Sequence, residues 1–367
     1  MKNSFGSSVC LTLFGESHGA MLGAVLDGLA PGIPVDTDFI AHQLSLRRPA
    51  GRISTARREA DEVQLVSGVF EGRTTGTPLG ILIPNADTRS RDYAATRALA
   101  RPGHADYTAF LKYHGHEDYR GGGHFSGRVT AALVAAGAVC LTALRRRGIQ
   151  IGTHIARCGG VADRDFGDAQ ADLAALNETA FAVLDETAGA RMREVITQAA
   201  AEGDSVGGVL ETLVLGLPAG VGEPWFDTLE GLLAHGLFSI PAVKGVEFGD
   251  GFGLSQLRGS QANDPFALDP AGNIVTKSNR NGGINGGISN GMPLRIRCAV
   301  KPTPSIYKAQ ETVDFLKREE AELRLHGRHD PAIVHRARVV ADSVCALVLC
   351  DALALRYGTD WLGGEGP

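Results

Sequence analysis

The alternation of hydrophobic and polar residues divides the chain into short strands and a smaller number of helices. Runs typical of β-strands lie at residues 9–14, 22–26, 63–70, 79–83, 209–215 and 294–300. Helical spacing covers residues 37–46, 188–201 and 226–235. An Ala/Leu/Val-rich segment after Arg128 predicts a buried helix that stops at Gly148. This mixture predicts an α+β fold in one or two domains.

Two predicted helices have clear boundaries. Asp36 or Thr37 caps the helix that ends ahead of Pro49. The last helix runs to about Tyr357 and stops at Gly358, with Asp330 as its predicted N-cap and Pro331 as its first helical residue. If Asp330 also lies beside a cleft, the cap would hold its carboxylate in a fixed position, where it could act as a base.

Composition indicates a soluble globular protein. The net charge is -5, 44% of the residues are hydrophobic and 21% are charged, which excludes a general attraction to nucleic acid or acidic membranes. The 48 glycines and 16 prolines favour tight turns and backbone that lies against ligands. We find no charged-then-apolar leader and no apolar run of about 18 residues, so we expect a cytoplasmic protein without a membrane segment.

Several common functional motifs are missing. The six cysteines are scattered without a CxxC pair, which argues against a zinc ribbon or redox dithiol and favours reduced, buried thiols. His114 and His116 lack a third ligand at a familiar spacing, so we predict no metal site. No 20–50-residue repeat, P-loop or GxGxxG motif is present.

Positive charge is instead concentrated in one short segment. Five arginines fall within twelve residues broken by Pro49 and Gly51, which suits a loop: Arg47, Arg48, Arg52, Arg57 and Arg58. Phosphate or carboxylate ligands are natural partners for such a loop. A surface salt-bridge network with Glu59, Asp61 and Glu62 is an equally good interpretation.

A glycine run precedes the buried helix. Gly121–Gly123 is followed by His124, Phe125, Ser126 and Arg128. Glycines before a helix N-terminus let backbone N–H groups approach an anion, and an arginine can clamp it. The alternative is a loop that only begins a helix. Lys301, among prolines and hydroxyls, presents the same choice between a phosphate contact and an ordinary loop.

Two histidines lie in turns that could hold them toward a cleft. His18 follows Glu16-Ser17 and precedes Gly19, and His104 follows Pro102-Gly103. A histidine with polar neighbours can act as a general acid or base near neutral pH. Most single loop histidines have no such role.

In combination, these segments resemble the chorismate synthase family, over nearly the whole chain. The resemblance is carried by FGESHG (14–19), RRPAGRISTARRE (47–59), SGVFEGRTTGTPLG (67–80), RPGHADYT (101–108), YRGGGHFSGR (119–128), EGDSVGG (202–208), AVKGVEFGDGF (242–252), NGGINGGISNG (281–291), KPTPSI (301–306) and GRHDP (327–331). The segment of about 152–201 is the least similar and reads as a variable periphery.

The resemblance implies a fold and an activity. The fold would be one domain over residues 1–367, a β-α-β sandwich with helices between antiparallel sheets, assembled as a homotetramer. The activity would be anti-1,4-elimination of phosphate from 5-enolpyruvylshikimate 3-phosphate to give chorismate. Reduced FMN would be required without net redox change, and cofactors commonly carry such hard steps. NAD(P)H would serve only as a source of electrons, used directly or through a separate flavin reductase.

The resemblance also implies roles for individual residues. His18 would be the general acid near the departing phosphate, His104 would lie near flavin N1, and Asp330 would work with flavin N5 in removing the substrate proton. Substrate anions or the flavin phosphate would be bound by Arg47, Arg48, Arg52, Arg101 and Arg128. FMN contacts would come from His124, Phe125, Ser126, Ala242, Gly286, Lys301, Pro302, Thr303, Pro304, Ser305 and Arg328.

The chain departs from the family pattern at a few positions. His124-Phe125 stands where Arg-Ser is common, and Pro241 where Asn is common. Asp342 replaces a usual Glu, and Ala30 a usual Pro. None of these touches the two histidines or Asp330. The rival interpretations are a flavin-dependent oxidoreductase that consumes NAD(P)H and a non-catalytic polyanion-binding module with steep salt dependence.

Overall fold

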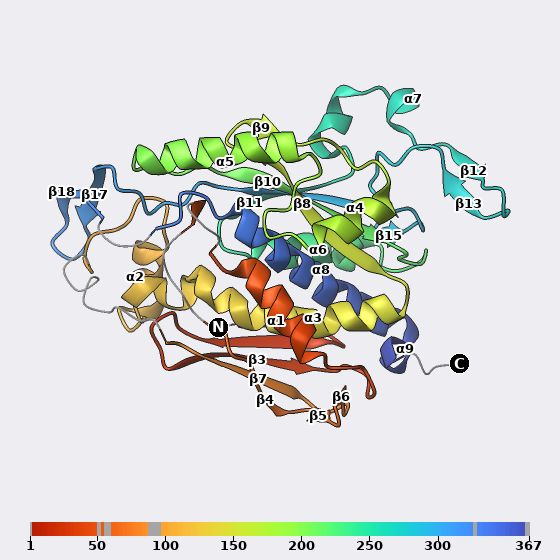
Figure 1. Cartoon of the computed structure of the whole chain (residues 1–367), viewed down its shortest axis with the longest axis horizontal. Coiled ribbons are helices and arrows are strands. Elements are labelled where there is room, and N and C mark those ends of the chain that lie inside the picture. Colours follow the sequence, from red (N-terminus) through yellow and green to blue (C-terminus); the bar gives the residue numbers. More distant parts are fainter. Residues whose placement is uncertain (1, 50–52, 55–59, 87–96, 326–328, 364–367) are drawn as a thin grey trace.

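Two antiparallel sheets enclose a layer of helices in the computed structural model, which describes residues 2–49, 53–54, 60–86, 97–325 and 329–363 (Figure 1). The first sheet has the order β1 (Ser4–Phe5), β2 (Cys10–Gly15), β3 (Met21–Asp27), β7 (Leu79–Pro84), β4 (Gln64–Ser67). The second has the order β11 (Val243–Phe248), β16 (Leu294–Val300), β10 (Gly208–Leu215), β8 (Gln150–Cys158), β9 (Val161–Ala162). This arrangement confirms the expected α+β sandwich.

The helices α1 (Thr37–Arg47), α3 (Thr130–Arg146), α6 (Leu229–Phe238) and α8 (Val334–Tyr357) pack together in this layer. Small residues let them approach closely. A Cβ on Gly137 of α3 would lie 2.3 Å from Cβ of Ser343 in α8, and a Cβ on Gly236 of α6 would lie 2.9 Å from a Val344 methyl group. On the other side of the second sheet, α4 (Ala169–Leu176) packs against β8 and α5 (Glu186–Ala201) against β9.

The remaining elements are short. They are α2 (Asp106–Tyr113), α7 (Gly259–Ala262), α9 (Asp360–Gly363), the 3₁₀ turns η3 (Arg120–Phe125), η4 (Gly127–Val129), η5 (Trp225–Asp227) and η6 (Gly251–Gln256), and the strand pairs β5 (Val69–Phe70)–β6 (Arg73–Thr74), β12 (Phe266–Leu268)–β13 (Ile274–Thr276), β14 (Ile284–Asn285)–β15 (Ile288–Ser289) and β17 (Gln310–Asp314)–β18 (Glu319–Leu323).

Residues 127–146, which include α3, form a helical segment that contains an 18-residue window apolar enough to cross a membrane. The segment therefore exceeds the apolar length expected from the sequence. However, 89% of that window is buried inside the molecule. Its hydrophobic character is that of a helix in the protein core.

Most predicted elements appear near their expected positions, and a few boundaries differ. Residues 63–70 form two strands, because Gly68 takes a positive φ of 78° and breaks the run. The helix expected at 226–235 begins later, because the Thr228 side chain caps it by accepting from Gly231 N at 3.0 Å. The segment expected to be peripheral begins with β8, a largely buried strand inside the second sheet.

The predicted start of the last helix is wrong. The helix α8 begins at Val334 with Ile333 at its N-cap position, so neither Asp330 nor Pro331 belongs to it. The Asp330 carboxylate instead accepts a hydrogen bond from Arg336 Nη1. Asp330 therefore pairs with Arg336, six residues later, and does not cap the helix.

Candidate active site

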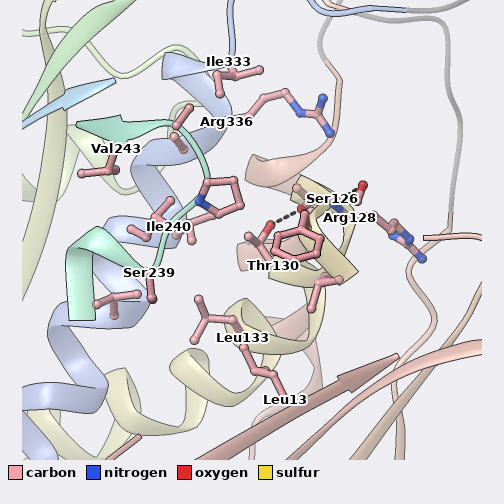
Figure 2. A pocket seen from close by; sticks show the side chains of 18 of the residues that line it. Leu13, Ser126, Arg128, Thr130, Leu133, Ser239, Ile240, Val243, Ile333 and Arg336 are labelled. Atoms are coloured by element: carbon pink, nitrogen blue, oxygen red, sulfur yellow. Dashed lines mark hydrogen bonds between the residues drawn. The ribbon is translucent and has the colours of Figure 1, made fainter. Parts of the chain in front are cut away.

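A cavity of about 950 Å³ opens where the helix layer meets the ends of both sheets. Apolar side chains from β2, α3, the α6–β11 connection, the start of β11 and α8 form one part of its wall, including Leu13, Leu133, Ile240, Val243 and Val340. Figure 2 shows Leu13 and Leu133 at one end of this cavity and Arg128 and Arg336 toward the other. The cavity is therefore amphipathic.

Cations dominate the charged part of the wall. Among the described residues, two carboxylates line the cavity, Asp61 and Asp330, against eight basic side chains: Lys2, Arg47, Arg48, Arg101, Arg128, Lys244, Lys301 and Arg336. A low-dielectric cleft lined by one sign of charge concentrates ions of the opposite sign. In a chain of net charge -5, this local excess favours an anionic ligand.

Three arginines converge on the buried Asp61. Arg47 Nη2 lies 3.2 Å from Asp61 Oδ2 and Arg48 Nε lies 3.8 Å from the same oxygen, while Arg128 Nη1 donates to Oδ1. Burial raises the pKa of Asp61, but the charges of Arg47 and Arg128 outweigh it and hold that pKa below its usual value. Burial lowers the pKa of Arg47 to about 10, so this guanidinium stays charged at neutral pH.

The Asp61 cluster shows how two arginines of the segment are engaged, Arg47 and Arg48; Arg52, Arg57, Arg58 and Glu59 lie outside the described residues. Ion pairing of Arg47 and Arg48 with Asp61 occurs in the cavity wall, and this one carboxylate offsets only part of the charge of three guanidinium groups. Arg128 is also held by Asn85 Oδ1, 3.0 Å from its Nε. The cluster is thus a rigid, cationic wall.

A second network surrounds His104. Its Nδ1 lies 2.8 Å from Asp106 Oδ1. Arg101 donates to both oxygens of the same carboxylate, from Nε to Oδ2 and from Nη2 to Oδ1, each at 2.7 Å. Burial raises the pKa of Asp106, but hydrogen bonds from Arg101 and His104 hold it far below its usual range. Two N–H groups of the Arg101 guanidinium are therefore already engaged by the Asp106 carboxylate.

The glycine run contacts both predicted histidines. Gly121, Gly122 and Gly123 all have positive φ. A Cβ on Gly121 would lie 2.1 Å from Cε1 of His18, and one on Gly122 would lie 3.4 Å from Nε2 of His104. The glycines thus leave room for two imidazole rings, while Ser126 caps the following turn by accepting from Arg128 N. His124 binds the Gly15 carbonyl through Nδ1 at 2.8 Å.

Asp330 and His329 form another part of the wall. Arg336 donates to Asp330 through Nη1 and to the Arg47 carbonyl through Nε at 2.9 Å, so it links α8 to the Asp61 cluster. Burial and the nearby charge of Arg101 lower the pKa of His329, and its Nδ1 is buried without a hydrogen-bond partner among the described residues.

Residues 301 and 303–305, which follow β16, also line the cavity. Lys301 donates from its backbone N–H to the Ala242 carbonyl at 2.9 Å and from Nζ to the Gly103 carbonyl. Ala242 has a positive φ of 74°, an uncommon backbone conformation for a residue with a Cβ. The hydroxyl oxygen of Thr303 is buried and has no hydrogen-bond partner in the part of the chain that the structure describes.

Most of the predicted site residues that the structure describes line this one cavity. They are Arg47, Arg48, Arg101, His104, His124, Phe125, Ser126, Arg128, Ala242, Lys301, Thr303, Pro304, Ser305 and Asp330. His18 is not among the lining residues but lies directly against Gly121, which is. Gly286 and Pro302 are described and lie outside the lining. Arg52 and Arg328 lie outside the described residues.

Sequence reasoning missed four contributors. Asp106, His329 and Arg336 were not singled out, and Asp61 was considered only as a surface ion-pair partner. The signal for Asp106 was its position two residues after His104 in the RPGHAD segment. No local pattern indicated that Arg47 and Arg128, 81 positions apart, share one carboxylate.

Comparisons with known proteins all point to one family. Residues 9–354 match the protein family described as chorismate synthase. The chorismate synthase of Thermococcus kodakarensis is 46% identical over 351 residues, covering 96% of this chain and 97% of that protein. The chorismate synthase of Dehalococcoides mccartyi is 47% identical over 361 residues, 98% of each chain. A crystal structure of chorismate synthase superimposes with a TM-score of 0.77 at 29% identity, covering 97% of this chain and 94% of that one.

Proposed function

Because this chain belongs to the chorismate synthase family, we propose that its cavity converts 5-enolpyruvylshikimate 3-phosphate to chorismate with reduced FMN. The observation that carries the proposal is the cation excess beside an apolar wall, with two histidines and a carboxylate at the boundary. The substrate brings two carboxylates and a phosphate, and such anions require several fixed guanidinium groups. The reaction is a lyase reaction of the shikimate pathway.

The residues present fit a flavin. Leu13, Leu133 and Val340 offer an apolar surface for a flat ring system, and the buried Thr303 hydroxyl offers an unfilled hydrogen bond for a phosphate oxygen. Lys301 and Ser305 lie on the same segment. We assign flavin binding to this segment together with Ala242 and 124–126. When bound, reduced flavin would lend electron density transiently to the elimination and recover it.

Substrate anions would meet the Asp61 cluster. Arg47 and Arg128 are fixed by Asp61 before any ligand arrives, and Arg336 is fixed by Asp330 and the Arg47 carbonyl. Preorganised cations lose little side-chain freedom on binding and stabilise charge that builds up on departing phosphate. These arginines would orient the substrate and help to stabilise the leaving group.

Three side chains would handle protons. His18, held against Gly121, would protonate the departing phosphate, and His104 would set the protonation of the reduced ring. Asp330, whose carboxylate is directed by Arg336, would take part in removing the substrate proton. Each group lies at or directly behind the cavity wall, where a general acid or base must be to reach its proton.

The proposal is tested by anaerobic turnover of 5-enolpyruvylshikimate 3-phosphate with reduced FMN, oxidised FMN or no flavin. Chorismate absorbance and phosphate release should rise together only with reduced FMN. His104→Ala should cut turnover strongly while its circular dichroism stays unchanged. The matched control is His42→Ala, because His42 binds the Asn177 carbonyl at 3.1 Å and does not line the cavity. Product from oxidised FMN, or none under any condition from a folded protein, would contradict the proposal.

We also infer that the protein acts as a cytoplasmic homotetramer. Support for self-association comes from the hairpin β12–β13, which extends from the body of the molecule and exposes apolar residues (Figure 1).

NAD(P)H would supply electrons to the flavin, either at this protein or through a separate flavin reductase. Neither route uses NAD(P)H in proportion to product.

A further inference from the structure

We infer that Asp106 is a positioning residue that fixes the tautomer of His104, so that Nε2 is the ring atom that exchanges a proton with the bound ligand. Asp106 does not line the cavity, whereas His104 does. Asp106 therefore acts on the reaction through the two lining residues that it binds, His104 and Arg101. The inference rests on the proposed function for its kinetic consequence, but its structural content is independent of that function.

The first step is the contact between the two side chains. His104 Nδ1 and Asp106 Oδ1 are 2.8 Å apart, and both side chains are mostly shielded, with exposed fractions of 18% and 19%. An ionised carboxylate can only accept hydrogen bonds. Arg101 Nη2 also lies 3.1 Å from Nδ1, and a guanidinium N–H can only donate. That Nη2 is nearer to Asp106 Oδ1, at 2.7 Å. We therefore assign its hydrogen bond to Asp106 and assign the proton in the histidine–carboxylate contact to Nδ1.

The second step is that the carboxylate cannot turn away. Arg101 binds Oδ2 from Nε and Oδ1 from Nη2, and its backbone N–H adds a bond to Oδ2 at 3.1 Å. Arg101 is itself tied to Ser305 through Nη1 at 3.4 Å. A planar, bidentate pair of this kind sets the direction of both carboxylate oxygens. Oδ1 is thereby aimed at the imidazole.

The third step concerns the other ring nitrogen. With the proton on Nδ1, the neutral ring carries its lone pair on Nε2. Nε2 lies near the position that a Cβ of Gly122 would occupy, at 3.4 Å, in the loop that separates His104 from His18. Gly122 has no side chain to cover Nε2, and His104 itself lines the cavity. The same logic orients histidines that bind metals or serve as general bases.

The test uses Asp106→Asn, which keeps the shape of the side chain but makes one terminal atom a donor. Arg101 requires acceptors, so the amide oxygen should turn to Arg101 and the NH₂ group to His104. That orientation stabilises the opposite tautomer, with the proton on Nε2. The control is Asp172→Asn, because Asp172 also accepts two hydrogen bonds from one arginine, Arg164, at 2.6 and 3.0 Å, outside the cavity lining.

The direct readout is the ¹⁵N shifts of the His104 ring in the full chain, recorded where the ring is neutral and assigned by comparison with His104→Ala. We expect protonated Nδ1 and unprotonated Nε2 in the wild type and in Asp172→Asn, and the reverse in Asp106→Asn. A wild-type ring protonated on Nε2 would overturn the inference, even if the Asn variant failed to fold.

The second readout is kinetic. Asp106→Asn should lower kcat roughly 10- to 100-fold and change KM for 5-enolpyruvylshikimate 3-phosphate by less than it changes kcat, because the amide oxygen still accepts from Arg101, which lines the cavity. A tautomer that does not change, or a wild-type kcat in the variant, would contradict the positioning role. If the wild-type protein gave no chorismate, the proposed function would fail, and the ring shifts would still decide the role of Asp106.

Discussion

Individual glycines set the positions of both histidines in the site. Gly121 and Gly122 have φ values of 59° and 84°; a Cβ on Gly121 would clash with the His18 ring, whereas one on Gly122 would only touch the His104 ring. Both residues therefore meet the requirement for a left-handed backbone, and Gly121 also meets a requirement for empty space. This explains why a glycine run, and not a single glycine, precedes the buried helix α3.

Replacing Gly121 by Ala should displace His18, because the new Cβ would lie 2.1 Å from Cε1. A misplacement of about 1 Å in a catalytic group costs on the order of 100-fold in rate, so we expect a loss of that order in chorismate formation. Gly272→Ala is the control, since it has a similar positive φ of 84° but nothing within 4 Å of its Cβ position. Equal losses in the two variants would show that backbone strain alone is responsible.

Local patterns revealed some site residues and concealed others. The glycine run, both histidines and the arginine segment were recognisable because their chemistry shows in neighbouring residues. Asp106 and Asp61 were missed, since a carboxylate has a role here only through arginines that the fold brings to it. Asp330 was placed in a helix cap on local preference, and the partner that holds it, Arg336, was not identified.

At the scale of elements, α8 connects the protein core to the site. Its buried His335 accepts or donates through Nε2 to the Ser54 hydroxyl at 2.7 Å and stacks on Phe181 with ring centroids 5.9 Å apart. Burial, with a smaller effect of the adjacent Arg336 charge, lowers the pKa of His335 from 6.5 to about 3. The ring is therefore neutral in the folded protein over most of the acidic range.

The stability of the fold should consequently fall on mild acidification. Below pH 6.5 the unfolded chain binds a proton at His335, whereas the folded chain does not until about pH 3. The unfolded state then binds more protons, so the free energy of unfolding decreases as the pH falls, by about 2 kcal/mol at about pH 5. His335→Gln should lose this component, measured by urea unfolding of both proteins at about pH 5 and about pH 7.5. An identical pH dependence in the variant would contradict it.

The elements themselves were largely predictable from periodicity. The strands at 22–26, 79–83, 209–215 and 294–300 and the helix capped by Asp36 appear close to their expected ranges, because each strand is a largely buried apolar run and the helix has a clear N-cap. What periodicity could not supply was the pairing of strands. The second sheet joins β8, β10, β11 and β16 from distant parts of the chain.

At the scale of the whole molecule, the hairpin β12–β13 extends beyond the two sheets and the helices between them (Figure 1). Phe266, Leu268 and Ile274 on the hairpin β12–β13 are 68%, 70% and 71% exposed, and Leu268 pairs with Ile274 across the two strands. Large exposed apolar side chains of this kind mark interaction surfaces. We expect this hairpin to contact another copy of the chain.

The double variant Leu268→Glu/Ile274→Lys should weaken assembly while preserving the hairpin, since opposite charges facing each other across strands are favourable. Light scattering after size exclusion should show the mass of four chains for the wild type and a smaller species for the variant. Leu316→Lys is the control, because Leu316 is 56% exposed elsewhere on the surface. A variant that remains tetrameric would show that the hairpin does not hold the assembly together.

The central claim is an elimination in which reduced flavin is required but not consumed. The most direct measurement is the number of chorismate and phosphate molecules formed per electron pair supplied. It is made without oxygen, with photoreduced FMN in small amount and substrate in large excess. We predict many molecules of each product, in equal number, for every reduced flavin. One chorismate for every flavin oxidised would contradict the account and indicate an oxidoreductase.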